Sequence, residues 1–502
     1  MRSESSGPFF CDAIGASALL SPAQMYRADQ MAIESGIAGT VLMESAGLAV
    51  ARAILQRYSP CRVLVLCGPG NNGGDGFVVA RHLKAAGWSV RLVLWGAATD
   101  LSGDAAHHAR LWSGVIEPWS PDLLQAVDLV VDALLGAGLS RAPEGELLHI
   151  IQAVNASSLA VCAVDMPTGL DGASGSAPAE VIQAHLTVTF FRKKPGHVVF
   201  PGRALCGEVV VADIGIPDTV LRDLDVQCAE NTPVNWITFF PRPSLTGHKY
   251  QRGHTLVVGG EHLTGAARLS AVACARVGSG LVSVAAPASV WSVYASALNS
   301  IMVQPFQSTS DLDALIGQSR RNSVVIGPGL GTQDHVRSMV LAVLSHRLAT
   351  VLDADAISVF QQTPDALLAA LHAHCVLTPH EGEFARLFPK LSGLRLEQAR
   401  QAAQLSGAIV VLKGPDTMIA APDGRVCINS NASPYLATGG TGDVLSGMIA
   451  GLLAQGMPAF EAACAGVWLH GQCSHAIGPG LIADDLPQSL PGVLSQLLGS
   501  MQ

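Results

Sequence analysis

Short apolar segments alternate with longer amphipathic segments along most of the chain, and this alternation limits the possible folds more than any other feature. The apolar segments have the length and the β-branched composition of strands, and the amphipathic segments have helical periodicity. Strands and helices in regular succession are typical of a doubly wound parallel sheet. In the first half of the chain, the strand-like segments are RVLVLCG, SVRLVLWG, VDLVVDALLG, LAVCAVDMPTG and LTVTFF.

The alternation lapses once, in the turn-rich segment CAENTPVNWITFFPRPSLTGHKYQRG, and then resumes. Turn-forming residues over such a length mark a boundary between domains, which we place at residues 230–245. We expect one α/β domain over residues 1–235, with residues 1–20 as a flexible tail, and a second over residues 236–502. The strand-like segments of the second domain are HTLVVGG, GLVSVAAP, SVVIGPGLG, ATVLDADAIS, HCVLTPH and AIVVLKG.

Composition and charge exclude several classes of protein. The 502 residues are 49% hydrophobic and only 14% charged, which suits sheets covered on both faces and does not suit disorder. The net charge of −9, without a long basic run, gives no electrostatic footprint for nucleic acid. No segment is apolar enough over the length needed to cross a membrane, and the eleven cysteines include no Cys-x-x-Cys pair. We expect a cytoplasmic protein that binds small molecules and neither nucleic acid nor membranes.

A glycine-rich turn, CGPGNNGGDG, follows the first strand-like segment. Gly68, Gly70 and Gly73 have the spacing of a dinucleotide-binding fingerprint, which also requires an acidic residue at the end of the second strand. That strand ends in LVLWG, and the next acidic residue is Asp100. The missing acidic residue therefore argues against an ordinary NAD-binding site.

Polar residues follow three strands of the first domain. Ligands of open α/β sheets bind at the carboxyl edge of the sheet, where these residues would gather. Amide, carboxylate and hydroxyl oxygens are hard ligands that suit a monovalent or divalent cation. The alternative is that each acidic residue only caps the helix after it. The residues concerned are Asn72, Asp75, Asp132, Asp165 and Thr168.

Together these segments resemble the NAD(P)H-hydrate epimerase domain, over about residues 20–220. The resemblance is carried by LMESAG, CGPGNNGGDGFVVARHL, VVDALLGAG, VDMPTGLDG and KKPGHVVFPGRALCGEVVVADIGIP. It implies a Rossmann-like, three-layer α/β domain with a potassium ion held by Asn72, Asp132 and Thr168. The sequence departs from the family at Ala137, where threonine is usual, and at Thr168, where serine is usual. The hydrated nicotinamide nucleotide would contact Asn71, Asn72, Gly73, Gly74, Asp75, Gly136, Ala137, Gly138, Leu139, Ser140, Arg141, Ala142 and Asp165.

A second glycine-rich turn, ATGGTGDVLSG, also carries an acidic residue. It lacks the Gly-Lys-Ser/Thr of a P-loop, but backbone N–H groups from Gly439 to Gly442 at a helix start suit a phosphate. Asp443 would lie in the first helical turn, where the dipole favours the ionised form and the carboxylate is placed to accept a hydroxyl proton. The alternative is a glycine-lined contact between helix and sheet, capped by this aspartate. Lys413 and Thr417, at another strand end, suit a nucleotide phosphate.

The second half of the chain resembles the ADP-dependent NAD(P)H-hydrate dehydratase domain, from about residue 240 to 495. The resemblance is carried by GGEHLTGAARLSA, GPGLG, LDADAIS, LTPHEGEFARLF, VVLKGPDTMIAAPDG and ATGGTGDVLSG. It implies a three-layer, ribokinase-like fold, a magnesium ion, ADP as co-substrate and Asp443 as the catalytic base. Ala432 and Ser433 stand where the family usually has a Gly-Asn pair. The hydrated cofactor would contact Ala266, Gly329, His380 and Asp443, and the adenine nucleotide would contact Lys413, Gly414, Pro415, Asp416, Thr417 and Gly442.

The two resemblances imply a bifunctional enzyme that repairs hydrated NADH and NADPH. The first domain would interconvert the R and S hydrates as an isomerase. The second would dehydrate the S hydrate with ADP as a lyase, giving AMP and phosphate. We also expect a homo-oligomer. Two alternatives stay open: a small-molecule kinase in the second domain, which would release a stable phosphorylated product, and a non-catalytic binding module in the first.

Overall fold

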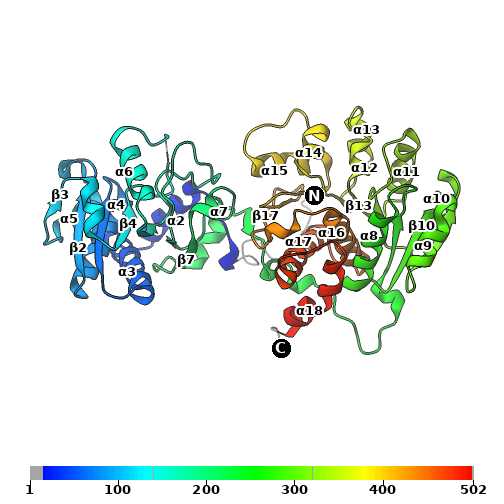
Figure 1. The fold of residues 1–502 in the computed structure, drawn as a ribbon, viewed down its shortest axis with the longest axis horizontal. Coiled ribbons are helices and arrows are strands. Elements are labelled where there is room, and N and C mark those ends of the chain that lie inside the picture. Colours follow the sequence, from blue (N-terminus) through cyan, green and yellow to red (C-terminus); the bar gives the residue numbers. More distant parts are fainter. Residues whose placement is uncertain (1–14, 140, 319, 500–502) are drawn as a thin grey trace. The chain divides into compact units, whose positions relative to one another are not determined.

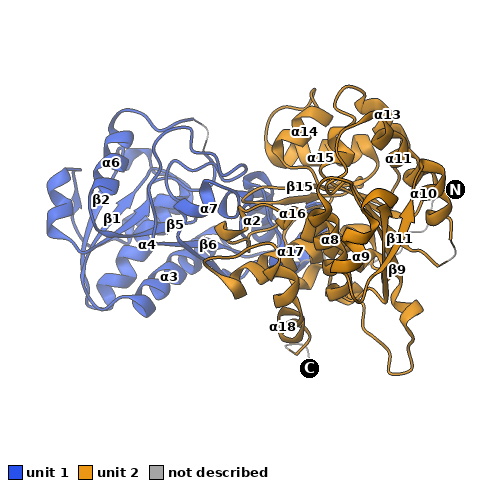
Figure 2. Cartoon of the chain, turned by 45° about the vertical axis from the view of Figure 1, so that its right-hand side comes forward, with its two compact units in different colours: residues 1–228 blue, residues 229–502 orange. Residues whose placement is uncertain are grey.

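The chain divides into two compact units, residues 1–228 and 229–502 (Figure 2). The structure, a computed structural model, describes residues 15–139, 141–318 and 320–499. The second unit begins a few residues before the boundary expected from the sequence, because the strand that opens it already belongs to its sheet.

The first unit is built on a seven-stranded sheet. Its strand order is β3-β2-β1-β4-β5-β6-β7, and every neighbouring pair is parallel. The chain starts in the middle, winds to one edge and returns to the other, which is the doubly wound order of a Rossmann-like fold. The strands are β1 (Arg62–Cys67), β2 (Ser89–Leu94), β3 (Ile116–Glu117), β4 (Leu129–Ala133), β5 (Ala160–Val164), β6 (Leu186–Phe190) and β7 (Glu208–Ala212).

Helices cover both faces of this sheet (Figure 1). Leu64 and Leu66 of β1 share a buried cluster with Ile151 of α6 on one face. Between them Val65 points to the other face, where a Cβ on Gly76 of α4 would lie 3.5 Å from its side chain. The alternation within β1 thus produces the three layers that the sequence predicts. The helices are α2 (Pro22–Glu34), α3 (Gly39–Arg57), α4 (Asn71–Ala85), α5 (Gly103–Arg110), α6 (Gly145–Ala156) and α7 (Gly202–Leu205).

The expected flexible tail, residues 1–20, is wrong for residues 15–20. Leu19 and Leu20 are 1% and 0% exposed. The backbone N–H of Leu20 donates a hydrogen bond to the carbonyl of Lys193 at 3.0 Å. Burial of two leucines stabilises this segment against the first unit, whereas the first fourteen residues lie outside the part of the chain that the structure describes.

The second unit has a ten-stranded sheet of order β11-β10-β9-β12-β13-β14-β15-β16-β17-β8. The strands from β11 to β15 pair in parallel, whereas β16 pairs antiparallel with both β15 and β17. The parallel part again has the doubly wound order. The strands are β8 (Cys228–Glu230), β9 (His254–Val258), β10 (Leu281–Pro287), β11 (Met302–Phe306), β12 (Ser323–Ile326), β13 (Ala349–Leu352), β14 (Cys375–Leu377), β15 (Ile409–Leu412), β16 (Met418–Ala420) and β17 (Val426–Ile428).

Two groups of helices lie on the two sides of this sheet (Figure 1). In one group α16 packs on α8, and glycines permit the close approach, since a Cβ on Gly447 would lie 2.2 Å from the carbonyl oxygen of Ser270. This group comprises α8 (Thr264–Val277), α16 (Thr441–Ala454), α17 (Ala459–Ile477) and α18 (Asp485–Gly499). The other helices are α9 (Trp291–Ala297), α10 (Thr309–Ile316), α11 (Asp334–Ser345), α12 (Asp355–Ser358), α13 (Pro364–Ala370), α14 (Glu381–Leu387) and α15 (Arg395–Ser406).

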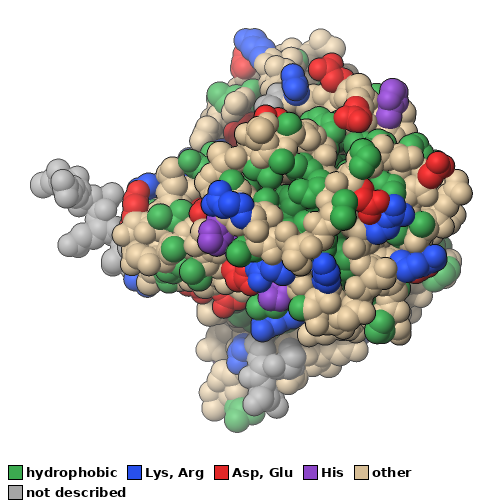
Figure 3. Space-filling model, turned by 90° about the vertical axis from the view of Figure 1, so that its left-hand side faces the viewer, with side chains coloured by type: hydrophobic (Ala, Val, Ile, Leu, Met, Phe, Trp, Pro, Cys, Tyr) green, Lys and Arg blue, Asp and Glu red, His purple; other side chains and the backbone are tan. Residues whose placement is uncertain are grey.

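On the face drawn in Figure 3, lysine and arginine side chains lie beside aspartate and glutamate side chains. Positive and negative side chains are therefore mixed on this face. Among the helices of the described residues, none combines the length and the apolar character needed to cross a bilayer.

Replacing Gly447 by alanine is expected to lower the free energy of unfolding of the second unit by about 2 kcal/mol, because the methyl group overlaps the backbone of α8. Gly492 of α18 is a matched control, since a Cβ there meets no atom within 4 Å. Alanine at that position should stabilise by up to about 1 kcal/mol through helix propensity. Urea unfolding of the two variants measures both effects, and equal stabilities would contradict the close packing of α16 on α8.

Candidate functional site

The first candidate site lies at the carboxyl edge of the seven-stranded sheet, where the neighbouring strands β1, β4 and β5 end. A cavity of about 430 Å³ opens there. The predicted ligand contacts that line it are Asn71, Asn72, Asp75, Gly136, Ala137, Gly138 and Asp165. The predicted contacts that do not line it are Gly73, Gly74, Leu139, Arg141 and Ala142, and Ser140 lies outside the described residues.

Glycines make the turn from β1 to α4 possible. A Cβ on Gly68 would lie 1.9 Å from the carbonyl oxygen of Leu134, and one on Gly73 would lie 1.8 Å from the carbonyl oxygen of Gly68. Backbone segments therefore approach more closely than any side chain permits. The turn places Gly70, the N-cap of α4, in the cavity wall, and the first N–H groups of the helix have no intrahelical acceptor. The start of α4 suits an anionic group of a ligand.

Asp132 and Thr168 form a buried polar pair beside the cavity wall. Thr168 donates from its backbone N–H to Oδ2 of Asp132 at 2.8 Å and from its hydroxyl to Oδ1 at 2.6 Å. Burial raises the pKa of Asp132 to about 6, although these hydrogen bonds oppose the shift. The side-chain nitrogen of Asn72 is buried and has no hydrogen-bond partner within the described residues. A carboxylate, a hydroxyl and an incompletely bonded amide are a donor set that fits a hard cation.

Within the described residues, no group of three His, Cys, Asp or Glu side chains is arranged to hold a metal ion. A cation at the first site would therefore be held by amide, hydroxyl and backbone oxygens together with the single carboxylate of Asp132. Such a set, with one formal charge, suits a monovalent ion better than zinc, which prefers nitrogen and sulfur ligands.

Sequence reasoning missed Lys194, although it lies in the KKPG motif. Its ammonium contacts Oδ1 of Asp165 at 2.5 Å and donates to the hydroxyl of Thr189 at 2.8 Å. The backbone N–H of Ala137 donates to Oδ2 of Asp165 at 3.1 Å. Burial is the largest influence and would raise the pKa of Asp165, but the charge and hydrogen bond of Lys194, together with His197 and the N–H of Ala137, hold the pKa below its usual value. Asp165 is therefore ionised at neutral pH, and its oxygens are occupied.

His197 fixes this ion pair from behind. Its Nδ1 accepts from the backbone N–H of Lys194 at 2.9 Å, so its Nε2 carries the hydrogen and donates to the carbonyl of Asp165 at 2.9 Å. Burial lowers the pKa of His197 to about 4, which keeps the ring neutral. Asp165 has a φ of +64°, a left-handed conformation that is rare for a residue with a side chain. The two hydrogen bonds of His197 hold that backbone in place.

Three further carboxyl groups line the cavity, those of Asp29 on α2, Asp75 on α4 and Asp104 on α5, and none of them has a hydrogen-bond partner within the described residues. Burial raises the pKa of Asp75 well above its usual value, and the charge of Asp165 adds to the effect. Burial also raises the pKa of Asp29 to about 6, against the opposing charge of Lys194. The glycine turn pointed to Asp75, whereas Asp29 lies in an amphipathic helix without a motif.

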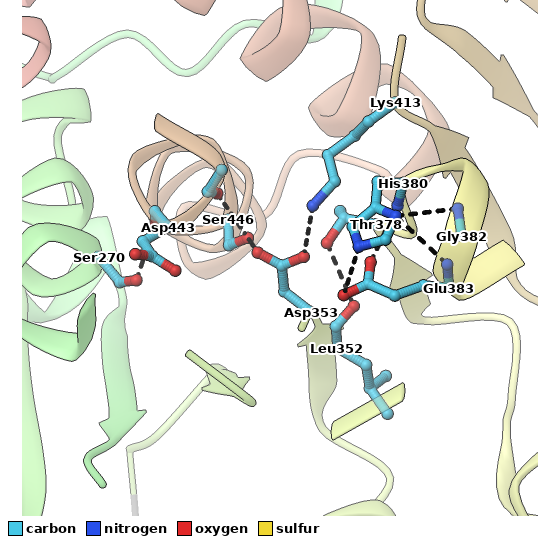
Figure 4. A network of polar contacts seen from close by, with 11 residues as sticks. Ser270, Leu352, Asp353, Thr378, His380, Gly382, Glu383, Lys413, Asp443 and Ser446 are labelled. Carbon is cyan, nitrogen blue, oxygen red and sulfur yellow. Dashed lines mark hydrogen bonds and ion pairs between the residues drawn. The ribbon is translucent and has the colours of Figure 1, made fainter. Parts of the chain in front are cut away.

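The second candidate site lies at the carboxyl edge of the ten-stranded sheet (Figure 4). The ammonium of Lys413, directly after β15, lies 2.7 Å from Oδ1 of Asp353, directly after β13. Ser446 of α16 donates to Oδ2 of the same carboxylate at 2.6 Å. Burial lowers the pKa of Lys413, but Asp353 outweighs burial and raises the pKa above its usual value. The sequence motif LDADAIS contained Asp353 without indicating this role.

Asp443 faces this ion pair from the first turn of α16 (Figure 4). Its backbone carbonyl accepts from the hydroxyl of Ser270 at 2.8 Å, which ties the turn to α8. The sequence predicts that the helix dipole favours the ionised form of Asp443, and burial opposes this effect. Burial and then the charge of Asp353 raise its pKa to about 7, and Lys413 offsets only part of this. A carboxyl group that titrates near neutrality is well matched to general base catalysis.

The predicted nucleotide loop, residues 413–417, connects β15 to β16. Thr417 closes it, since its hydroxyl accepts from the N–H of Gly414 at 3.2 Å and donates to the carbonyl of Gly414 at 3.0 Å. Arg395 of α15 forms an ion pair with Asp416, and a Cβ on Gly414 would meet its guanidinium group. Arg395 escaped prediction because it precedes the loop by a helix and a strand, without a motif of its own. Pro415 is exposed at the tip of the loop.

The remaining predicted contacts come from other strand ends. Gly329 and Ala266 lie together, since a Cβ on Gly329 would be 3.2 Å from that of Ala266. His380 caps α14, and its backbone bridges to that of Lys413. Gly442 lies in the first turn of α16, where a Cβ would be 3.4 Å from the ammonium of Lys413. The structure thus brings the loops after β14 and β15 to the start of α16.

Two α/β units that each carry buried carboxyl groups and a lysine–aspartate pair at the carboxyl edge of a sheet define a two-site enzyme for polar small molecules. Residues 39–196 match the family described as YjeF-related protein N-terminus, and residues 255–491 match the NAD(P)H-hydrate dehydratase family. The chain is 37% identical to the bifunctional NAD(P)H-hydrate repair enzyme Nnr of Moorella thermoacetica, over 95% of this chain and 97% of that protein. The chain belongs to the family of bifunctional NAD(P)H-hydrate repair enzymes.

The chain is similar to further proteins. The Nnr enzyme of Escherichia coli is 34% identical over 90% of this chain and 89% of its own length. Among solved structures, the ADP/ATP-dependent NAD(P)H-hydrate dehydratase from Bacillus subtilis, co-crystallised with ATP and Mg²⁺, is 28% identical with a TM-score of 0.46. That match covers 53% of this chain and 98% of that one.

Replacing Lys413 by methionine is expected to lower the free energy of unfolding of the second unit by about 3 kcal/mol, because buried Asp353 loses its countercharge. In an Asp353→Asn background the same change should cost about 1 kcal/mol or less, since no buried charge is left unpaired. Urea unfolding at pH 7.5 measures both, with Lys390→Met as an exposed control. Equal losses in the two backgrounds would show that the ion pair does not decide the stability of the site.

Proposed function

We propose that the chain returns hydrated NADH and NADPH to the active cofactors, with one reaction in each unit. The first unit interconverts the R and S hydrates, and the second dehydrates the S hydrate with ADP, giving AMP and phosphate. The observation that carries the proposal is the position of Asp443, with a pKa of about 7, beside Lys413 at the start of a helix. A cytoplasmic location and a homo-oligomer stay predictions.

In the second unit, the ADP phosphates would bind at Lys413 and the first turn of α16. The ring hydroxyl of the hydrate attacks the β-phosphorus and gives its proton to Asp443, while the bond to the bridging oxygen breaks and AMP leaves. Phosphate then departs with the electron pair of the carbon–oxygen bond, and the neighbouring carbon loses a proton to restore the ring double bond. Lys413 and the backbone N–H groups at Gly442 stabilise the negative charge that develops during transfer.

Magnesium would accompany the nucleotide phosphates, because this ion is commonly held by phosphates, water and one or two carboxylates. The acidic side chains whose charges raise the pKa of Asp443 are Asp353 and Asp355. Asp353 is already paired with Lys413 and Ser446, whereas the Asp355 side chain accepts a single hydrogen bond within the described residues, from the N–H of Gly331 at 2.8 Å. Asp355 is therefore the carboxylate best suited to the ion, whose contribution would be neutralisation of phosphate charge.

In the first unit, we assign a potassium ion to Asn72, Asp132 and Thr168. The support is the buried carboxylate of Asp132 beside a threonine hydroxyl, and the incompletely bonded amide of Asn72. A bound cation would favour the ionised carboxylate, which burial alone disfavours. The amide oxygen of Asn72 would be its ligand to the ion.

The purified chain is expected to restore reduced-nicotinamide absorbance completely from a mixture of hydrated NADH epimers, and only when ADP is present. The Asp443→Asn variant should lose at least about 100-fold in the dehydration rate, because the general base is removed, and should still interconvert the epimers. Asp334→Asn, a change at the exposed first turn of α11, is the matched control. Absorbance recovery and chiral chromatography of the hydrates measure the two reactions separately.

Other outcomes of this assay separate the alternatives. Recovery that stops at the S fraction would leave the dehydratase and remove the epimerase. A stable phosphorylated product without recovered NADH would favour the small-molecule kinase. Full activity with ATP in place of ADP would correct the identity of the co-substrate.

Potassium chloride is expected to stabilise the first unit relative to sodium chloride at equal ionic strength, and the gain should grow from pH 5.5 to 7.5. The pKa of Asp132 is about 6 in the folded chain and near 3.8 when unfolded, so the fold loses stability as pH rises through 6. A bound cation offsets that loss, by about 2.7 kcal/mol at a hundredfold excess over its dissociation constant.

Thermal unfolding of the first unit measures this difference between the two salts. Asp132→Asn should abolish both the potassium effect and its pH dependence. Unchanged epimer interconversion in the Asp132→Ala variant would remove the assignment of the cation site.

A further inference from the structure

We propose that Asp29 of α2 is a catalytic residue of the first unit, which exchanges a proton with the oxygen at the reacting ring carbon in partnership with Asp75 of α4. This inference rests on the epimerase activity proposed above and identifies the groups that move its protons. It follows from the position of α2, from the free carboxyl oxygens in the cavity and from the chemistry that epimerisation requires.

The α2 helix presents Asp29 to the cavity on an apolar face. Ser21 and Gln24 form a capping box at its start, and the Gln24 side chain donates to the carbonyl of Leu224 at 3.0 Å, which fixes the helix against the rest of the unit. Asp29 is the only charged residue of α2 in the cavity lining. The other residues of this segment in the lining are Pro22, Met25, Tyr26 and Ile33.

A carboxyl group on an apolar face, without a hydrogen-bond or ion-pair partner among the described residues, costs folding free energy. An alanine or a leucine would pack there without that cost. Catalytic sites typically contain such groups, which lower stability and have pKa values shifted toward neutrality. Asp29 and Asp75 both fit this description.

Apart from Asp75, the other charged residues that line the cavity with Asp29 are Lys194, Asp165 and Asp104. Lys194 and Asp165 form the clamped ion pair, and the oxygens of Asp165 are taken by Lys194, Thr189 and the N–H of Ala137. Asp104 of α5 lines the cavity beside Gly39 at the start of α3. Asp104 is half-buried and has no hydrogen-bond partner within the described residues, like Asp29, whereas Asp29 and Asp75 both lie close enough to Asp165 and Lys194 for those charges to act on their carboxyl groups.

Epimerisation of the hydrate needs one proton donor and one proton acceptor. Hydration of an enamine places the hydroxyl group on the carbon next to the ring nitrogen. When that oxygen receives a proton, the carbon–oxygen bond breaks, water leaves with the electron pair, and the nitrogen lone pair forms a carbon–nitrogen double bond. Water then adds to the other face of the carbon, the double-bond pair returns to nitrogen, and the added water loses a proton. No oxidant or further reactant is required.

The environments of the two carboxyl groups assign their starting roles. Asp75, with a pKa well above the usual value, holds a proton and is the donor. Asp29, with a pKa of about 6, is mostly ionised at neutral pH and is the acceptor. Each turnover moves one proton from Asp75 to Asp29, so the reverse reaction uses the same two groups with roles exchanged. The cation formed at the ring is stabilised by the ionised Asp165 in the same cavity.

The test uses the full chain carrying Asp443→Asn, so that dehydration does not consume the hydrates. In this background Asp29→Asn should lower kcat for epimer interconversion by at least about 100-fold, as expected for loss of a positioned acid or base, with KM changed less than about threefold. Glu34→Gln removes an exposed charge from the same helix and should leave the rate unchanged. Asp29→Glu should restore part of the activity.

Two readouts separate catalysis from a structural role. The rate of the parent enzyme should fall as pH drops through about 6, where Asp29 becomes protonated, and this limb should vanish in Asp29→Asn. Interconversion in ¹⁸O-labelled water should introduce one labelled oxygen per event in the parent. The variant should unfold at or above the parent's midpoint, because the unpartnered charge is removed, and should retain the potassium response.

The outcomes distinguish this inference from the activity on which it rests. Interconversion by Asp29→Asn within threefold of the parent, or with an unchanged acidic limb, overturns the role of Asp29 and leaves the epimerase intact. Loss of activity together with loss of the potassium response also overturns it, in favour of a structural role. Absence of interconversion in the parent overturns the epimerase itself.

Discussion

In each unit, a lysine–aspartate pair at the carboxyl edge of the parallel sheet determines the charge around the candidate site. In the first unit Lys194 holds Asp165, which directly follows β5, and in the second Lys413 holds Asp353, which directly follows β13. The aspartate charge of each pair adds to burial in raising the pKa of a neighbouring carboxyl group. The neighbours raised in this way are Asp75 and Asp443.

The ion pair and the raised pKa belong to one arrangement. Without its lysine, a buried aspartate would itself take up a proton, because an unpaired charge in a low dielectric is too costly to keep. Its neighbour would then titrate closer to its ordinary value. His197 supports the first pair, since its neutral ring forms hydrogen bonds with the backbone of both Lys194 and Asp165. The Asp353 pair is held in a comparable way by Ser446 of α16.

The sequence predicted most of the fold and the part of the sites that lies on motifs. Apolar runs of strand length gave both parallel sheets, because strands buried on both faces must be apolar throughout. The edge at which Asn72 and Asp165 meet followed from the rule that carboxyl ends of parallel strands gather on one side. The antiparallel pair β16 and β17 escaped, since segments of three residues carry no periodicity.

What the sequence left out are residues whose role depends on distant contacts. Asp29 and Arg395 lie in amphipathic helices, and their positions relative to the sites follow from helix packing that no local pattern encodes. The buried leucines at Leu19 and Leu20 look like the end of a tail until the strand partner near Lys193 is known. A proton affinity is set by the whole environment of a group, so the position of Asp443 in a helical turn could not reveal its pKa.

The two units use the same electrostatic device for opposite steps. At the first site the protonated carboxyl group is the useful form, because the hydroxyl group of the hydrate must leave as water, and strong burial beside an ionised aspartate keeps the proton in place. At the second site the ionised form is useful, because the hydroxyl oxygen must become a nucleophile. There Lys413 limits the upward shift to about 7, so that a substantial fraction of Asp443 is ionised at neutral pH. The balance between one carboxylate and one ammonium near the reacting group thus decides whether an aspartate gives a proton or takes one.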